Sequence, residues 1–321
     1  MNTIASTNST VFSSAFIPIS VTFSSGSPSI ITQNNYTLIS LLNTGTYSFT
    51  LKGCAGKTIY FCVVGGGSGG GRGQTGNQWG GSGGSGGQVI YGSYVIVNNN
   101  ITCSATVGPG GMPSYYGNAG RGTAPVSGYD NGNTTYGTTT ANDFGSSGGV
   151  YCSGGFSILS CSNEWTNIKA LGGVSGITNT ASFCSSTGYS LGTNTAATFY
   201  QGKSGGAGVQ GNTTPNNGIT GYSLSIAGNT VIFSSSAGGS QVDQTQQSTS
   251  GTNAGKSSGS SGSYTGWSSP GYYDGFPGTD NTGSGGGGGS GSGGNPNQSS
   301  GANFGRQAGG YGGSGVIYIW Y

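Results

Sequence analysis

The residues able to carry out chemistry are few and scattered along the chain. There is no histidine, and the carboxylates are Asp130, Asp143, Glu164, Asp243, Asp274 and Asp280. A glycosidase needs two carboxylates that face each other across the sugar, but no spacing in this sequence pairs two of them. Asp274 and Asp280 stand in Asp-Gly and Asp-Asn steps, which are ordinary turn formers. We therefore expect no enzyme, with no catalytic residue, no cofactor and no metal ligand.

The cysteines offer a second kind of chemistry, and they are Cys54, Cys62, Cys103, Cys152, Cys161 and Cys184. No CxxC spacing and no histidine is available, so a structural zinc site is not expected. Cys54 and Cys62 flank a predicted turn, and Cys152 and Cys161 bracket a short segment. Each of these two pairs is a candidate for a local disulfide. The alternative, buried free thiols that pack as small apolar side chains, stays equally open.

Charge and glycine patterns predict no nucleotide or nucleic-acid site. Residues 250–257 have the spacing of a phosphate-binding P-loop, but Ser250 stands in place of the first glycine and no helix is expected to follow. The eight Lys and Arg residues are nowhere adjacent and leave a net charge of +2. Nucleic-acid binding requires clustered positive charge. Nucleic acid is therefore excluded as a main partner.

Aromatic side chains are the best candidates for a binding site. One cluster lies within a short stretch and consists of Tyr264, Trp267, Tyr272, Tyr273 and Phe276. Aromatic rings stack on sugar faces and anchor protein receptors. We predict that this cluster contacts a glycan or a protein on a host surface. The alternative for each ring is a wedge that packs against glycine segments in a chain poor in leucine.

The elements that position these residues are predicted to be β-strands. β-branched and aromatic residues, separated by turn signals, indicate strands at 16–23, 29–32, 36–42, 46–51 and 58–64. A further strand pair, 88–97 and 101–107, is predicted around Asn98, Asn99 and Asn100. No window shows the apolar period of a helix. The fold class is therefore all-β.

Glycine dominates the rest of the chain, with 72 of 321 residues, while charged residues make up 4%. Without a Cβ, extended helices with three residues per turn can approach until their backbones bond to one another. We predict β-sandwich-like strands that bracket a glycine-rich region of packed polyglycine II helices. A flexible linker is the alternative, but 19 Tyr and 4 Trp interleaved with glycine favour an ordered structure.

Three regions follow from this pattern. Residues 1–20 form an N-terminal arm and a candidate assembly strand, residues 21–64 form the N-terminal strands, and residues 65–321 form the glycine-rich domain. A C-terminal strand at 315–321 closes this domain. We expect it to pair or stack with the strand that ends at Val64, because both strands adjoin glycine and would enclose the glycine-rich region as one unit.

Several motifs carry a resemblance to a known family. They are Thr44–Leu51, Lys57–Gly71, Gly86–Gly92, Ala105–Gly111 and the C-terminal Gly312–Tyr321. Together they resemble the glycine-rich domain of phage tail-fibre adhesins and other virion surface proteins, over about residues 32–321. The resemblance implies a sandwich of polyglycine helices between strands, with variable loops that meet the host receptor. The six cysteines and the Asn/Thr/Ser-rich insertions, such as 134–144 and 235–250, depart from the family.

The function predicted from these features is structural. No signal peptide and no membrane span is recognised in the sequence, so we expect a virion surface or extracellular location reached without a signal peptide. The chain is predicted to be a non-catalytic, self-assembling component of a virion surface or extracellular fibre. A lectin-like adhesin tip that binds glycan or receptor is the alternative, and an unfolded low-complexity chain is a third.

Self-association is expected because a nearly uncharged surface lacks the repulsion that keeps proteins apart. The apolar stretch from Val11 to Ile19 could add as a strand to the open sheet edge of a neighbouring copy. We therefore predict a homo-oligomer or filament in which the arm takes part. The alternative is that the arm covers an edge of its own domain.

Overall fold

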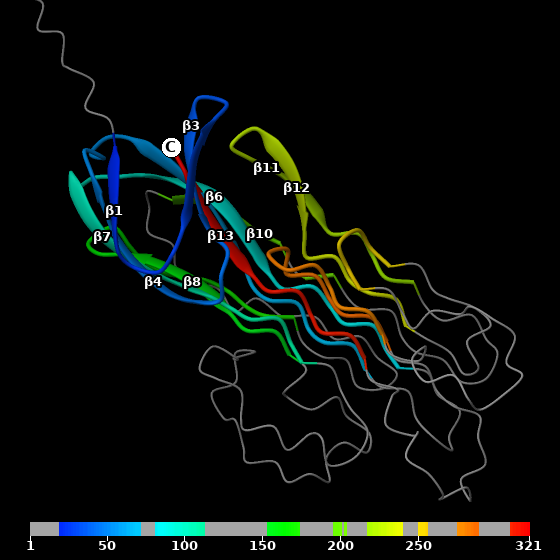
Figure 1. Cartoon of the computed structure of the whole chain (residues 1–321). Coiled ribbons are helices and arrows are strands. Elements are labelled where there is room, and N and C mark those ends of the chain that lie inside the picture. The colour runs from blue at the N-terminus through cyan, green and yellow to red at the C-terminus, as the bar shows by residue number, and fades with distance from the viewer. Residues whose placement is uncertain are drawn as a thin grey trace, which may run out of the picture.

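The computed structural model describes residues 19–71, 81–112, 153–173, 195–200, 202–203, 217–239, 250–255, 275–288 and 309–321 (Figure 1). All regular secondary structure in these ranges is β-strand, and every strand pair is antiparallel. The all-β prediction is therefore confirmed at this level.

Two sheets and one separate hairpin contain the strands. The five-stranded sheet has the order β1 (Ser20–Ser25), β4 (Gly45–Lys52), β7 (Asn100–Val107), β8 (Ser157–Cys161), β9 (Trp165–Ala170). The six-stranded sheet has the order β10 (Thr195–Tyr200), β6 (Val89–Val95), β5 (Thr58–Val64), β13 (Val316–Trp320), β3 (Tyr36–Leu41), β2 (Ser29–Gln33). The hairpin joins β11 (Tyr222–Ile226) to β12 (Asn229–Phe233).

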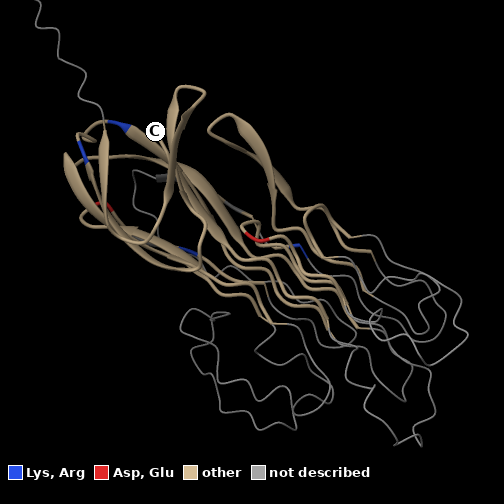
Figure 2. Cartoon of the chain, viewed as in Figure 1, with Lys and Arg blue, Asp and Glu red and all other residues tan. Residues whose placement is uncertain are grey.

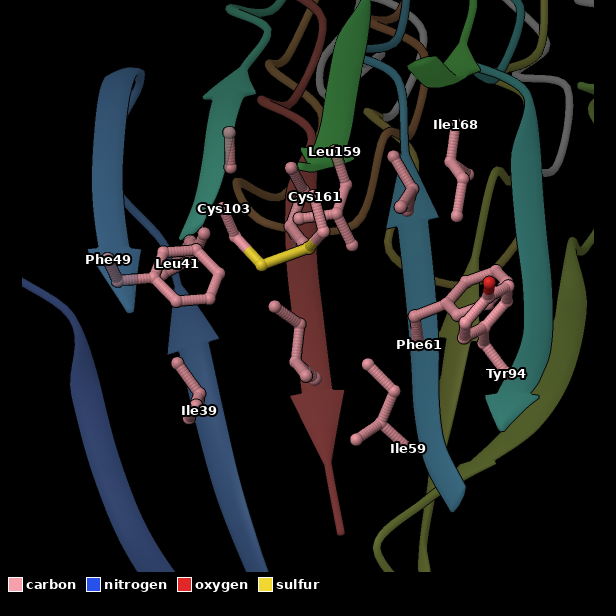
Figure 3. Close-up of a cluster of buried hydrophobic side chains, with 14 of the residues drawn as sticks. Ile39, Leu41, Phe49, Ile59, Phe61, Tyr94, Cys103, Leu159, Cys161 and Ile168 are labelled. Atoms are coloured by element: carbon pink, nitrogen blue, oxygen red, sulfur yellow. A yellow bond between two sulfur atoms is a disulfide. The ribbon is translucent and has the colours of Figure 1, made fainter. Parts of the chain in front are cut away.

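The main hydrophobic core lies between the two sheets. Phe49 and Leu159 of the five-stranded sheet and Ile39 and Phe61 of the six-stranded sheet belong to one buried cluster (Figure 3). These side chains alternate with outward residues because successive residues of a strand point to opposite faces. Burial of this apolar area is the dominant favourable contribution to folding. The two sheets therefore form a sandwich.

A second buried cluster lies on the outer face of the six-stranded sheet. Leu38, Val64 and Trp320 of that sheet pack there with Leu224 and Phe233 of the β11–β12 hairpin. Figure 1 shows the hairpin beside this sheet. The six-stranded sheet is therefore covered on both faces over part of its area, which explains the continuous apolar run at the end of β5.

Glycine segments continue from the strand ends and run side by side away from the sandwich (Figure 1). The segment 65–71 bonds through its backbone to several others, namely 81–88, 108–112, 153–155, 171–173, 275–288 and 309–315. A Cβ on Gly84 would lie within 3.0 Å of the Ser68 carbonyl oxygen, closer than real Cβ atoms come. The interior of this region is therefore made of backbone.

The hydrogen bonds of segment 65–71 repeat with a period of three residues. Gly65 donates to Gln88 at 2.9 Å, Ser68 donates to Ser85 at 2.9 Å, and Gly71 donates to Ser82 at 2.7 Å. All three acceptors lie on segment 81–88. The residues between them donate to other segments, as Gly66 does to the Gly155 carbonyl at 2.9 Å. The segment thus meets the same neighbour once every three residues.

The strands predicted at 58–64 and 315–321 agree with the structure, whereas the strand predicted at 16–23 only overlaps β1, Ser20–Ser25. The strand predicted at 58–64 has the bounds of β5, and β13 pairs with β5 from Val316↔Val64 to Trp320↔Tyr60. The expected pairing of the C-terminal strand with the strand ending at Val64 is confirmed. The predicted N-terminal arm, apart from its last two residues, lies outside the described residues.

The predicted pairing of strands 88–97 and 101–107 is wrong. β6 pairs with β5 and β10 in the six-stranded sheet, whereas β7 pairs with β4 and β8 in the five-stranded sheet. The connection at 96–99 crosses from one sheet to the other. Each strand buries an apolar side in the same core, so a crossover between the sheets satisfies this pattern as well as a hairpin would.

Candidate functional site

An array of aromatic rings lies on the outer face of the six-stranded sheet. The Tyr60 ring stacks on the Trp320 ring with centroids 5.6 Å apart, and Tyr36 meets Tyr60 edge to face at 6.3 Å. The Tyr91 ring centroid lies 5.7 Å from that of Trp320. Trp320 is buried, while the three tyrosines are half-buried. We call Tyr36, Tyr60, Tyr91 and Trp320 the aromatic face.

Strand alternation puts these rings on one face. Tyr60 stands between Ile59 and Phe61, which both point into the sandwich core. Trp320 is paired with Tyr60 across β13 and β5, and residues directly opposite in an antiparallel pair share a face. The alternation of Tyr60 and Trp320 with aliphatic residues in the sequence indicates this face, whereas the predicted contact residues lie at 264–276.

The hairpin β11–β12 borders the aromatic face and fixes one of its rings. The Tyr91 hydroxyl donates a 2.8 Å hydrogen bond to the Ser225 carbonyl. Burial raises the pKa of Tyr91, and neighbouring ionisable groups, Cys62 first, add to this effect. The phenol is therefore neutral at physiological pH. This face can offer flat ring surfaces and hydroxyl groups without charge.

Charged groups are sparse over the described part of the molecule (Figure 2). Its carboxylates are Glu164, in the sandwich, and Asp280, in the glycine region. Asp280 accepts a 3.0 Å hydrogen bond from the Ser314 backbone N–H and so holds two glycine-rich segments together. Among the described residues, no three His, Cys, Asp or Glu side chains gather where they could hold a metal ion.

Glu164 links the two sheets at the turn between β8 and β9. Its carboxylate accepts hydrogen bonds from the backbone N–H groups of Val97 at 3.1 Å and Asn98 at 2.6 Å. Burial raises the pKa of this carboxyl, but the hydrogen bonds from Asn98, Val97 and Tyr94 outweigh that effect, and the net pKa is lowered. The carboxylate thus anchors the crossover between β6 and β7. This role is structural, and no second carboxylate of the described residues lies beside it.

One predicted contact residue, Phe276, lies within the described residues. Its side chain is 53% exposed, and its carbonyl accepts a 2.8 Å hydrogen bond from Gly287. Phe276 therefore sits on the surface of the glycine region, where a partner could reach it. The other predicted contacts, Tyr264, Trp267, Tyr272 and Tyr273, lie outside the described residues.

Hydrogen bonds join several segment ends in the glycine region. Gly71 donates to the Ser82 carbonyl at 2.7 Å, and Gly70 donates to the Gly310 carbonyl at 2.8 Å. Gly287 donates to the Phe276 carbonyl at 2.8 Å, and Gly310 donates to the Gly287 carbonyl at 2.8 Å. These segment ends therefore lie close to one another.

The cysteine pairing differs from the predicted local bridges. Cys161 forms a disulfide with Cys103, its directly opposite neighbour on β7, and not with Cys152 (Figure 3). Cys54 and Cys62 are buried free thiols, as the alternative interpretation had it. Cys54 belongs to the core between the sheets and Cys62 to the cluster on the outer face, so the six-stranded sheet separates them.

Comparison with protein-family models and with curated protein sequences finds no match for this chain. No helix in the described ranges has the length and apolarity to cross a membrane.

Proposed function

We propose that this chain is a non-catalytic structural and adhesive component of a virion surface or extracellular fibre, where it self-assembles into a homo-oligomer or filament. The observation that carries the proposal is the glycine region, whose interior consists of mutually bonded backbone. A flexible linker would not order its peptide groups in this way. A region packed in this way is suited to act as a stiff spacer.

The period of three in the backbone hydrogen bonds supports an assignment of the glycine segments as polyglycine II helices. A helix of this type has three residues per turn and no internal hydrogen bonds. Its N–H groups must therefore bond to neighbours, and each neighbour is met again after three residues. The donors Gly65, Ser68 and Gly71, all bonded to segment 81–88, follow this rule.

Mechanical stiffness follows from this packing. Each segment forms hydrogen bonds with the buried peptide groups of its neighbours. One segment therefore cannot slide without breaking hydrogen bonds to several others. The uncharged surface adds little repulsion between copies. A stiff body of this kind, with little charge repulsion between copies, is suited to serve as a rigid unit of a fibre or particle surface.

Immunogold labelling tests the proposed location. Antibodies raised against residues 19–321 would be applied to intact and to detergent-opened particles or fibres and viewed by negative-stain microscopy. We expect labelling of the exterior of intact particles. Labelling that requires opening of the particle would contradict the proposal, and pre-absorption of the antibody with the purified chain provides the control.

A lectin-like adhesin tip is the second candidate function. It is favoured by the aromatic face, which combines half-buried tyrosines with a surface that has almost no charge, and by the predicted contacts Tyr264, Trp267, Tyr272, Tyr273 and exposed Phe276. Neutral sugars bind by stacking on such rings. The host partner would be a surface glycan or protein.

Glycan-array binding of two variants separates these surfaces. The first variant replaces the predicted contacts at 264–276 by Ala, and the second carries Tyr36→Ala and Tyr60→Ala. A loss of binding in one variant assigns the glycan site to that surface. Binding that survives both sets of changes would rule out the lectin-like function at these residues.

A further inference from the structure

The strand β2 is an edge of the six-stranded sheet with an unusual surface. Its one paired strand in the described structure is β3, and four of its five residues are exposed. The fifth residue, Gln33, accepts a 3.0 Å hydrogen bond from Asn229 in the turn of the β11–β12 hairpin. Ile30 and Ile31 are each 45% exposed. Ile30 is opposite Ile39, which points into the sandwich, and Ile31 is opposite Leu38, which points to the outer face. Each face of this edge therefore presents one exposed isoleucine.

Natural sheet edges are normally protected by charge, proline or a covering segment. The sequence of β2, Ser-Ile-Ile-Thr-Gln, contains neither a charged residue nor a proline. The edge strand β9 carries Lys169, and the edge strand β1 turns Val21 and Phe23 toward the core. Among β1, β2 and β9, it is β2 that presents exposed apolar side chains to an added strand.

We infer that β2 accepts the N-terminal arm of a second copy of this chain as an added antiparallel strand. This inference rests on the proposed self-assembly and names its interface. Residues 1–18 of the predicted arm precede Ile19 and β1, and they contain no charged side chain. The sequence Val11-Phe-Ser-Ser-Ala-Phe-Ile17 places Phe12 and Phe16 on one face of a strand and Val11, Ala15 and Ile17 on the other. Each face can therefore cover one of the two isoleucines.

Chain direction favours the arm of a neighbour over the chain's own arm. β1 begins at Ser20, opposite Lys52, and a short turn at 26–28 reverses the chain into β2. Ser20 therefore lies toward the Gln33 end of β2. Residues 11–17 of the same chain, laid along β2, would have to run parallel to it before reaching Ser20. The strand pairs of the described structure are antiparallel, and parallel pairs are less stable per residue.

An exchange of this kind generates an open assembly. The arm and β2 are different surfaces of one chain, so the contact is heterologous, and repetition extends a filament unless the rotation closes a ring. Each copy donates one arm and accepts one arm. This interface supplies a physical basis for the homo-oligomer or filament proposed above.

Light scattering and sedimentation of purified chains test the interface. The full chain should associate with rising concentration, whereas the chain shortened to residues 19–321 and the full chain with Ile31→Lys should be monomers or associate at least tenfold more weakly. The matched control is Val97→Lys, at a 63% exposed position away from β2, which should associate as the parent chain does. Circular dichroism melts establish that each variant is folded.

A full chain that stays monomeric, or an arm-deleted chain that associates as the parent does, would overturn the inference. If the Val97→Lys control also loses association, added charge rather than the edge is responsible, and the inference fails as well. Particle labelling does not depend on these outcomes, so the proposed location and this interface can fail separately.

Crosslinking of two complementary chains identifies the occupant of the edge. The acceptor chain consists of residues 19–321 with Ile31→Cys, and the donor chain carries Ile31→Lys and Phe16→Cys, both with Cys152→Ser and Cys184→Ser. A short bis-maleimide should yield an acceptor–donor heterodimer that disappears without Phe16→Cys. Acceptor homodimers would show that β2 pairs with β2 instead, and an absence of heterodimers would show that the arm does not reach a neighbour. Either result overturns the inference.

Discussion

Cys103 on β7 and Cys161 on β8 stand directly opposite each other in the five-stranded sheet and form a disulfide across 58 residues. The bond closes a loop that contains residues 104–160. Closure of a loop of this size restricts the unfolded chain. We expect Cys103→Ala with Cys161→Ala to lower the free energy of unfolding by about 2–4 kcal/mol, measured by urea denaturation.

A reductant provides the control for this disulfide prediction. Dithiothreitol should shift the urea midpoint of the parent chain toward that of the double variant and leave the midpoint of the variant unchanged. Equal midpoints for the parent chain and the variant under oxidising conditions would show that the bond does not stabilise the fold.

Glycine is required where the segments of the glycine region approach most closely. A Cβ on Gly84 would meet the Ser68 carbonyl oxygen and the Gly286 backbone nitrogen within 3.0 Å, and both belong to neighbouring backbone that cannot move aside alone. Overpacking in a tight core costs about 1–3 kcal/mol and can cost more. We expect Gly84→Ala to reach the upper end of this range in urea denaturation.

The matched control for the Gly84 prediction is Gly56, which lies in a turn with φ of +72° and has open space around its Cβ position. Asn tolerates this left-handed conformation better than other residues do. Gly56→Asn should therefore change the free energy of unfolding by less than about 1 kcal/mol. A Gly84→Ala variant as stable as Gly56→Asn would refute backbone packing at this position.

Local alternation explains which strands could be predicted. Tyr60 and Cys62 alternate with inward-facing Ile59, Phe61 and Val63, and such a pattern depends on neighbours within one segment. The partner of a strand depends on distant residues instead. The crossover at Asn98, for example, is held by Glu164, which is far away in sequence, and no local feature of Asn98–Asn100 distinguishes this crossover from a hairpin turn.

The cysteine pairing and the contacts between glycine segments cannot be predicted from the sequence for the same reason. Cys161 meets Cys103 only because β8 pairs with β7 in one particular register. Gly66 bonds to Gly155, but a run of glycines has no side chains that specify register. The aromatic face, in contrast, can be predicted from the sequence. Tyr60 and Trp320 each alternate with inward-facing aliphatic or aromatic residues, and their two strands are predicted to lie in one sheet.

Glu164 should make stability depend on pH in the acid range. Its folded pKa lies below the ordinary value of 4.5, so the carboxylate stabilises the fold above pH 4.5 and this contribution is lost as pH falls through the folded pKa. We expect Glu164→Gln to cost about 1 kcal/mol at pH 7, allowing for partial solvent exposure.

Urea denaturation of the parent chain and Glu164→Gln between pH 7 and pH 3 checks this prediction. The difference in free energy of unfolding should shrink below pH 4.5, because the protonated carboxyl of Glu164 no longer accepts hydrogen bonds as a charged group. A difference that stays constant down to pH 3 would show that the charge of Glu164 does not stabilise the crossover.

Cys62 should resist alkylation in the folded protein. It is fully buried beneath the outer face of the six-stranded sheet, and burial raises the pKa of its thiol well above the usual range. The thiolate is the reactive form, so both access and ionisation are suppressed. With iodoacetamide at pH 8, we expect Cys62 to react at least 100-fold more slowly than an introduced Val97→Cys at an exposed position. Peptide mass spectrometry measures both rates in one sample, and unfolding in guanidinium should make them similar. Equal rates in the folded protein would mean that the outer face of this sheet opens far more readily than its packing implies.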